Sequence, residues 1–178
     1  DEDGFAVRAP DSTSFVGAIE TAEQFGWRIY AEAVRRDLWS AQSVVVLGDG
    51  ANWIRNLADT HFPGATQIVD LYHAREHVSD LCKILFAGSE RQIVRHRMRW
   101  WTLLDAGKVE RIVAQALRGL PDQPMVRKKA ELEIEYLRRN KERMRYADFR
   151  DRGLFVGSGV IEAGCKTIIA HRLKQSGM

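Results

Sequence analysis

The sequence predicts an α/β domain that is interrupted by a block of helices. Short β-branched runs alternate with segments of helical periodicity near both ends of the chain, the pattern of an α/β sheet. Strand signals are lost between residues 83 and 150, where three or four helices are expected. The length of 178 residues accommodates one domain with an insertion. We therefore expect residues 1–82 and 151–178 to form one core, split by a helical insertion at residues 83–150.

The first part of the core begins with an expected strand over residues 14–20. Thr21 then caps a helix over residues 21–38, because Gln24 completes a capping box with it. Residues 44–47 form a continuous, largely β-branched run, which predicts a strand buried on both faces. Asp49 therefore falls at the C-terminal end of a central strand.

A second strand and two further helices complete this first part. The helix over residues 52–62 ends at Pro63 and Gly64, a strong stop signal. Residues 65–72 predict the second strand, and His73 is expected to open a helix over residues 73–86.

The expected insertion is basic. Residues 83–150 carry 17 Lys and Arg side chains against 9 Asp and Glu, whereas residues 1–82 carry 6 against 13. A basic segment can follow a phosphate backbone and release counterions when it binds. The alternative is that long helices simply carry Arg and Lys on solvated faces.

The last part returns to the α/β pattern. Residues 153–159 predict a strand and a glycine-rich turn, and a helix follows. The turn at residues 157–159 could bind a phosphate at the helix N-terminus, or it could serve only as a tight turn.

Bulk features point to a cytoplasmic protein without a membrane anchor. The two cysteines, Cys82 and Cys165, are far apart and fit ordinary thiols in a reducing compartment. No apolar run approaches the ~20 residues that cross a membrane, and the acidic start is not a signal peptide. The chain begins at Asp1 and stops after a helical segment, so we expect a fragment of a longer protein.

Three carboxylates stand at the ends of expected elements in the same core. Asp49 and Asp70 end strands, and Glu162 lies in the first turn of the last helix. Magnesium prefers carboxylate oxygens, and two-metal phosphoryl transfer needs several of them at one point. Each residue alone has a simpler explanation, since Asp-Gly pairs form turns and Glu favours a helix N-terminus.

Other candidates have structural alternatives. His73 and His77 are one helical turn apart and could bind zinc, but no matching Cys or acidic partner pattern accompanies them. Trp100 and Trp101 could stack on bases while nearby arginines contact phosphates. The alternative places one of these tryptophans in the core and the other at an interface.

Four segments carry a family resemblance. LGDGANWIRNLADTHFPGATQIVDLYHAREH and LFVGSGVIEAGCKTIIAHRLKQSGM resemble signature blocks of the ISKra-four group of bacterial insertion-sequence transposases. RMRYADFRDRGL and IETAEQFGWRIYAEAVRR add to the resemblance. The group is similar to Mutator-like transposases, which implies a DDE enzyme with an RNase H-like core.

The resemblance implies roles for individual residues. Asp49 matches the second catalytic Asp and Glu162 the catalytic Glu, so both would bind a two-metal site of Mg²⁺ or Mn²⁺. Asp70 and His73 match an Asp-x-x-His element, which leaves Asp49, Asp70 and Glu162 as an alternative triad. The residues expected to contact DNA are His73, Arg75, Arg95, Arg97, Arg99, Trp100, Lys166, Arg172 and Lys174. The family also implies a homo-oligomer bound to transposon ends and target DNA.

One departure from the family concerns the first catalytic Asp, which the resemblance places on a strand upstream of Asp1. We therefore expect this chain alone to be catalytically inactive and prone to aggregation through an exposed strand edge. Two other functions stay open. One is a non-catalytic DNA-binding remnant or host-adopted fragment, and the other is an unrelated metal-dependent phosphohydrolase.

Overall fold

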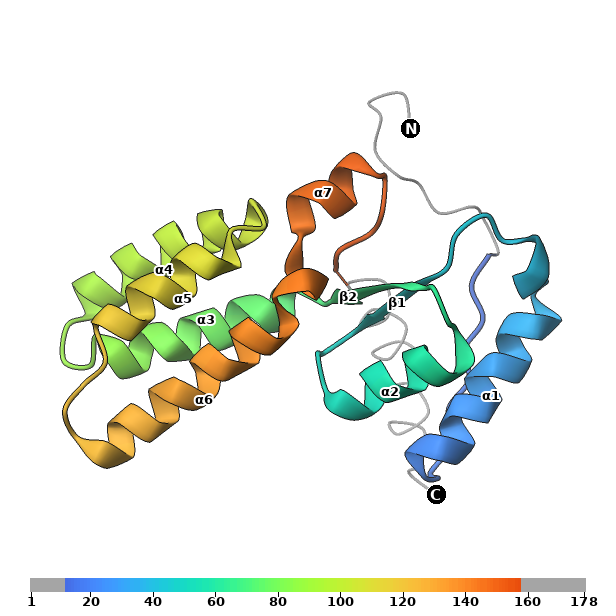
Figure 1. Cartoon of the computed structure of the whole chain (residues 1–178), viewed down its shortest axis with the longest axis horizontal. Helices are drawn as coiled ribbons and strands as arrows, with labels where there is room; N and C mark the ends of the chain where they lie inside the picture. Colours follow the sequence, from blue (N-terminus) through green and yellow to red (C-terminus); the bar gives the residue numbers. More distant parts are fainter. Residues whose placement is uncertain (1–11, 158–178) are drawn as a thin grey trace, which may run out of the picture.

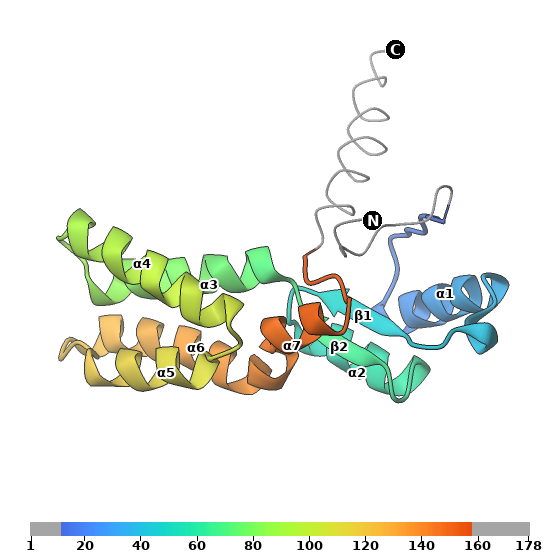
Figure 2. The ribbon, with the colours of Figure 1, turned by 90° about the horizontal axis from the view of Figure 1, so that it is seen from above.

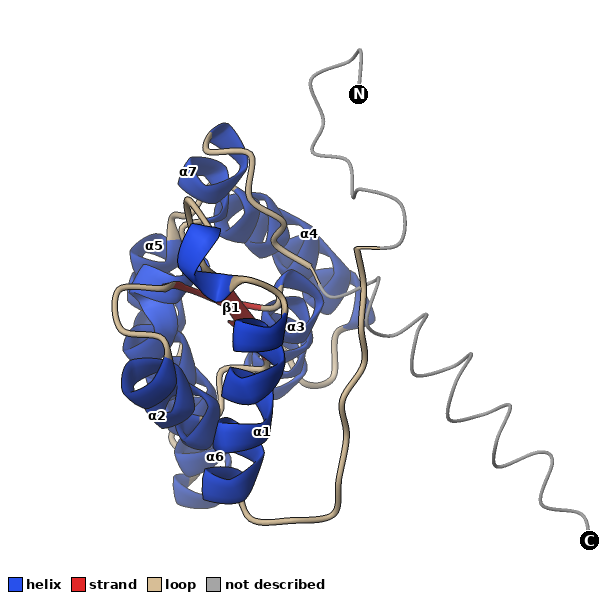
Figure 3. Ribbon diagram, turned by 90° about the vertical axis from the view of Figure 1, so that its right-hand side faces the viewer, coloured by secondary structure: helices blue, strands red, loops and turns tan. Residues whose placement is uncertain are grey.

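The computed structural model describes residues 12–157 as a mostly helical chain with one small parallel sheet (Figure 1). Figure 3 shows how little of this chain is strand. No helix within these residues has the length and apolar character needed to span a bilayer. In chain order the elements are α1 (Ala22–Arg35), η1 (Leu38–Ser40), β1 (Val45–Gly48), α2 (Asn52–His61), β2 (Thr66–Val69), α3 (Leu71–Leu85), α4 (Glu90–Asp105), α5 (Val109–Arg118), α6 (Pro124–Asn140), η2 (Lys141–Met144) and α7 (Tyr146–Asp151).

The sheet is one β–α–β unit in which α2 connects two parallel strands. Val45 of β1 lies opposite Thr66 of β2, and Gly48 lies opposite Val69, so both strands end at the same edge. Both strands were expected from their β-branched runs and both are present, but β1 is not buried on both faces as expected, because Val45 is exposed and the rest of the strand is half-buried. Among the described residues each strand is hydrogen-bonded to one other strand. The side of β1 that faces away from β2 therefore has no neighbouring strand in this range.

Helix α1 packs against α2 through a glycine. The expected capping box is confirmed, because Thr21 Oγ1 accepts from the amide of Gln24, whose side chain accepts in turn from the amide of Thr21. A Cβ atom on Gly26 would lie 2.6 Å from Nε2 of His61, so the contact between the two helices requires a residue without a side chain there.

Two expected strands are not formed, and the start of one helix differs from the expectation. Residues 14–20 are not part of a strand, and their exposed Phe15 and Val16 bury no apolar face. The expected strand at residues 153–159 is not formed in its described part, up to residue 157. Helix α3 begins at Leu71 rather than at His73, because the carboxylate of Asp70 caps it.

Helices α3 to α6 form a bundle that contains most of the hydrophobic core (Figure 2). Helix α3 packs on α4 and α6, and α5 packs on the same two helices from the other side. Helix α3 crosses residues 82 and 83 without a break, so the bundle starts at Leu71, before the boundary that the sequence suggested. The largest fully buried side chains are Trp100, Tyr146, Leu81, Leu104, Ile112, Leu137 and Met144.

Candidate functional site

Two aspartates stand side by side at the carboxyl edge of the sheet. Asp49 follows β1 and Asp70 follows β2, and the backbone amide of Asp70 donates to the carbonyl of Gly48 at 2.7 Å. Neighbouring strands lie about 4.8 Å apart, so the two residues are adjacent at one edge. Ligand sites in open α/β sheets lie beyond this edge, which makes it the candidate site.

The carboxylate of Asp49 is exposed and only partly used. One oxygen, Oδ1, accepts a hydrogen bond from the amide of Ala51 at 2.8 Å, which fixes the turn that follows β1. The other oxygen makes no hydrogen bond to any residue in the range 12–157. Asp49 can therefore present a free carboxylate oxygen to a cation in solution.

Asp70 has a structural task. Its side chain is 5% exposed, and its Oδ1 accepts from the amides of Tyr72 at 2.8 Å and His73 at 3.1 Å. These amides belong to the first turn of α3 and have no carbonyl partner within the helix. The capping role accounts for a carboxylate at this position without a metal ion.

The turn that carries Asp49 is held in place by the helical bundle. The phenol of Tyr136 in α6 donates to the backbone carbonyl of Asp49 at 2.7 Å. Arg143 donates to the carbonyl of Gly50 at 3.4 Å. Gly50 has a φ of +87°, a conformation that favours glycine, and a Cβ atom there would lie 2.7 Å from the Tyr136 phenol oxygen.

A second layer of contacts orients Tyr136. Its ring stacks on the imidazole of His77 with 3.6 Å between ring centroids, and His77 Nδ1 lies 2.6 Å from Glu133 Oε2. Burial raises the pKa of the Tyr136 phenol, and the negative charge of Asp49 raises it further. The phenol therefore stays protonated and remains a donor to the Asp49 turn.

The chain returns to this edge just before Glu162. The amide of Leu71 donates to the carbonyl of Val156 at 2.9 Å, and Gly157 lies against the ring of Tyr72. Glu162 follows Gly157 by five residues, which span at most ~18 Å when extended. Glu162 itself, together with the DNA-contact candidates Lys166, Arg172 and Lys174, lies outside the described residues.

The described residues do not form a metal site by themselves. No group of three or more His, Cys, Asp or Glu side chains that could hold a metal ion occurs within residues 12–157. Asp49 offers a free oxygen, whereas the Asp70 carboxylate already caps α3. His77 is engaged by Glu133, so the zinc alternative with His73 gains no third ligand in this region. A metal site here needs Glu162 or another carboxylate from outside the described residues.

Two residues expected to contact DNA face the protein instead. Trp100 is 1% exposed and its Nε1 donates to Gln115 Oε1 at 3.1 Å, so the expectation that it stacks on a base is corrected. Arg97 lies over the ring of Trp101, at 5.6 Å from its centroid. Trp100 therefore lies in the core, as the alternative interpretation expected, whereas Trp101 is half-buried and its Nε1 donates to the backbone carbonyl of Arg75 at 3.2 Å.

Of the other residues expected to contact DNA, some pair with carboxylates of the protein and some have no partner among the described residues. Arg75 pairs with Asp105 at 2.6 Å and also lies over the Trp101 ring. His73 is half-buried, with its Nδ1 3.3 Å from Glu76. Arg95 and Arg99 are exposed and have no ion pair or hydrogen bond with any residue in the described range.

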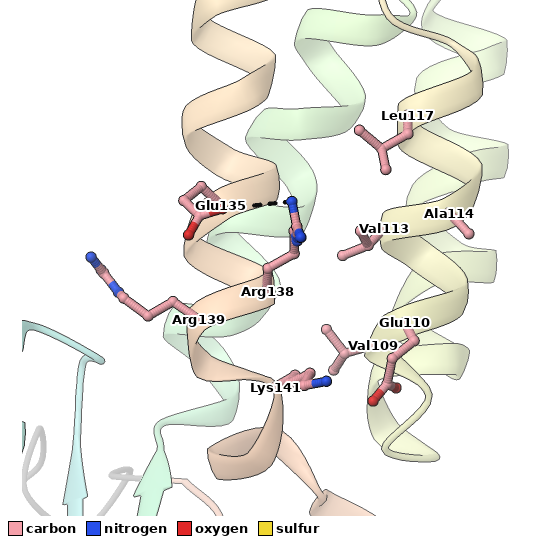
Figure 4. Close-up of a pocket in the computed structure, with 9 residues that line it drawn as sticks. All are labelled: Val109, Glu110, Val113, Ala114, Leu117, Glu135, Arg138, Arg139 and Lys141. Atoms are coloured by element: carbon pink, nitrogen blue, oxygen red, sulfur yellow. Dashed lines mark ion pairs between the residues drawn. The ribbon is translucent and has the colours of Figure 1, made fainter.

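A separate groove of about 560 Å³ lies between α5 and α6 (Figure 4). Its apolar wall includes Val113 and Leu117, and Arg138 points across it while pairing with Glu135 at 3.9 Å. None of the expected catalytic residues lines this groove. It is therefore not part of the candidate site at the sheet edge.

Comparisons of this chain with protein-family models, with curated proteins and with solved structures gave no match.

Sequence reasoning located Asp49 but missed its supports. Tyr136 is 87 residues away from Asp49 and belongs to a helix whose pattern shows only which side is apolar. Glu133 and Tyr136 are three residues apart and therefore share a face of α6. That spacing indicates only that Glu133 and Tyr136 are neighbours on α6. It does not indicate that the Tyr136 phenol donates to the carbonyl of Asp49.

Proposed function

We propose that this chain carries part of the catalytic centre of a DDE-type DNA transposase with an RNase H-like core. The proposed reaction is metal-dependent cleavage and transfer of DNA strands at insertion-sequence ends. The proposed setting is the bacterial cytoplasm, with a homo-oligomer holding the DNA ends. These proposals rest on the sequence resemblance together with the geometry of the sheet edge.

The observation that carries the proposal is the exposed Asp49 carboxylate at the C-terminal end of β1, one oxygen of which makes no hydrogen bond to a described residue. Strand order and register bring Asp70 to the same edge. The hydrogen bond between Leu71 and Val156 returns the chain there shortly before Glu162. Residues that are far apart in sequence thus approach one edge, as a shared site requires.

Asp49 and Glu162 are the residues that would hold Mg²⁺ or Mn²⁺, with Asp70 as the alternative third carboxylate. Such a cation, when bound, activates a water or hydroxyl nucleophile and stabilises the departing oxygen. The protein's own contribution is positioning. Tyr136 fixes the backbone of the Asp49 turn, and the amide of Ala51 fixes one carboxylate oxygen and leaves the other without a hydrogen bond among the described residues.

Mn²⁺ binding to the 178-residue chain tests the metal site. Binding is the readout, because Mn²⁺ can bind to the carboxylates of this chain without a complete catalytic set. The free Mn²⁺ signal in electron paramagnetic resonance should fall on addition of the protein. Asp49→Asn and Glu162→Gln should each weaken the affinity by at least about tenfold.

Two matched variants locate the site. Asp59 is an exposed carboxylate of α2 that hydrogen-bonds Gln67, so Asp59→Asn should leave Mn²⁺ affinity unchanged. Asp70→Asn keeps a capping side chain and should also bind Mn²⁺ normally if Asp70 only caps α3. Loss of binding in Asp70→Asn would favour the alternative triad. Equal losses of Mn²⁺ affinity in Asp49→Asn and Asp59→Asn would refute a metal site at the carboxyl edge of the sheet.

A non-catalytic DNA-binding remnant is the second candidate, and the unpaired arginines of α4 favour it. This function needs DNA affinity that falls steeply with salt and does not depend on a divalent cation. DNA binding that is unchanged by chelators, in a chain that binds no Mn²⁺, would select this function over the transposase.

A further inference from the structure

We propose that the outer face of α4 and α5 is a binding surface for the phosphate backbone of duplex DNA. Five arginines form this surface, which we call the α4–α5 basic face. They are Arg91, Arg95, Arg99, Arg111 and Arg118. The inference goes beyond the proposed catalysis, because it requires neither Asp49 nor a metal ion.

The first three arginines form one stripe along α4. Arg91, Arg95 and Arg99 are spaced by four residues, all three are exposed, and they therefore share one side of the helix. Four residues rise about 6 Å along a helix. Each strand of B-DNA presents a phosphate about every 3.4 Å along its axis, so successive arginines match roughly every second phosphate.

These charges are not neutralised by the protein. None of the three has an ion pair or a hydrogen bond with a residue that the structure describes. Arg97 of the same helix, by contrast, lies over the Trp101 ring. Burial lowers the pKa of His96, and the positive charges of Arg95 and Arg99 lower it further.

Helix α5 extends the surface. The hydrogen bond between Trp100 Nε1 and Gln115 Oε1 places Gln115 on the side of α5 that faces α4. Arg111 is four residues before Gln115 and Arg118 is three residues after it, so both lie on that side. Both side chains are exposed and have no ion pair or hydrogen bond with another described residue. Helices α4 and α5 contact each other, and Figure 2 shows them closest near the loop that joins them.

Most acidic side chains of α4 and α5 pair with arginines that are not part of the α4–α5 basic face. Asp105 at the end of α4 pairs with Arg75 and Arg150, and Glu110 of α5 pairs with Arg145. Glu90 at the start of α4 is the remaining acidic residue of these two helices. A hollow of about 630 Å³ lined by Arg91 and Arg95 lies at the same end of α4. The α4–α5 basic face is therefore accessible and predominantly positive, as phosphate-backbone binding requires.

Fluorescence anisotropy with a labelled DNA duplex of mixed sequence tests the proposal on the 178-residue chain. If all five arginines contact phosphates, the logarithm of the association constant should fall with the logarithm of salt concentration with a slope of about −4.5. Arg95→Gln/Arg99→Gln should weaken binding and make the slope shallower by about 2. Circular dichroism should show an unchanged fold, because both side chains are exposed.

The matched control is Lys128→Gln/Lys129→Gln. These lysines are also exposed, lie in α6 of the same bundle and lack partners among the described residues, so the charge change is identical. The control should leave the slope within about 0.5 of the parent value. Equal weakening by the two double variants would overturn the proposal, as would stronger binding to polyglutamate than to the duplex at the same salt concentration. Asp49→Asn should bind the duplex normally, so failure of the metal site and failure of the DNA surface are distinguishable.

Discussion

Replacement of Gly50 by alanine tests how tightly the bundle holds the Asp49 turn. The left-handed conformation of Gly50 costs an alanine about 1–2 kcal/mol. The new Cβ would lie 2.7 Å from the phenol oxygen of Tyr136, so that oxygen must move and its hydrogen bond to Asp49 breaks. Loss of this bond adds about 1 kcal/mol. We expect Gly50→Ala to lower the free energy of unfolding by about 2–3 kcal/mol.

Gly64 provides a matched control. Its φ of +83° is nearly that of Gly50, yet a Cβ atom added to Gly64 would have no atom within 4 Å. Gly64→Ala should therefore cost only the conformational part, about 1–2 kcal/mol. The difference between the two glycine variants measures the contact with Tyr136.

A double-mutant cycle separates the clash from the conformational cost. Tyr136→Phe alone should cost about 1 kcal/mol, because it removes the hydrogen bond to the Asp49 carbonyl. In Gly50→Ala/Tyr136→Phe the same hydrogen bond is lost once, so the combined cost should fall about 1 kcal/mol below the sum of the single costs. The unfolding free-energy costs of Gly64→Ala and Tyr136→Phe should be additive in the double variant.

Urea unfolding followed by far-ultraviolet circular dichroism is the assay, since most of the chain is helical. Additivity of the Gly50 and Tyr136 variants within about 0.4 kcal/mol would refute the proposed contact. A cost for Gly50→Ala no larger than that for Gly64→Ala would refute it independently.

Two further predictions concern the bundle core and its pH dependence. Trp100→Ala should cost about 3–5 kcal/mol in urea unfolding, whereas Trp39→Ala, at a side chain that is 74% exposed, should stay within about 0.5 kcal/mol. Burial lowers the pKa of His96 below its usual 6.5, so the folded state binds this proton less readily than the unfolded state. Stability should therefore fall as the pH drops below about 6.5, and His96→Phe should make that fall smaller; equal slopes in both proteins would contradict the assignment to His96.

The parts of the fold that the sequence predicted correctly are those with local signals. The β-branched runs located β1 and β2, and the Thr21 and Gln24 pair located the start of α1. The position of Asp49 at the sheet edge follows from the parallel pairing of consecutive strands. Residues 14–20 failed as a strand because strand formation depends on a pairing neighbour, which a local pattern does not contain.

The burial of Trp100 was predictable from helical spacing. Ile93, Trp100 and Leu104 are seven and four residues apart, so they share the face that packs into the bundle. The neighbouring Trp101 is rotated away by about 100° and reaches Arg75 and Arg97 instead. The contact between Tyr136 and Asp49 was not predictable in this way, because it depends on how α6 meets the sheet.

The hydrogen bond between Leu71 and Val156 joins the two ends of the helical segment that runs from α3 to α7, at one point beside β2. Because the two ends of the segment from Leu71 to Val156 are fixed to each other, its loops far from the sheet can change length without shifting β1 and β2. The entropic cost of such growth is small, since doubling the length of a flexible loop adds only about 0.6 kcal/mol to its closure. The loops between α3 and α4 and between α5 and α6 are thus the places where added segments, such as a fluorescent or affinity tag, should leave the Asp49 edge undisturbed.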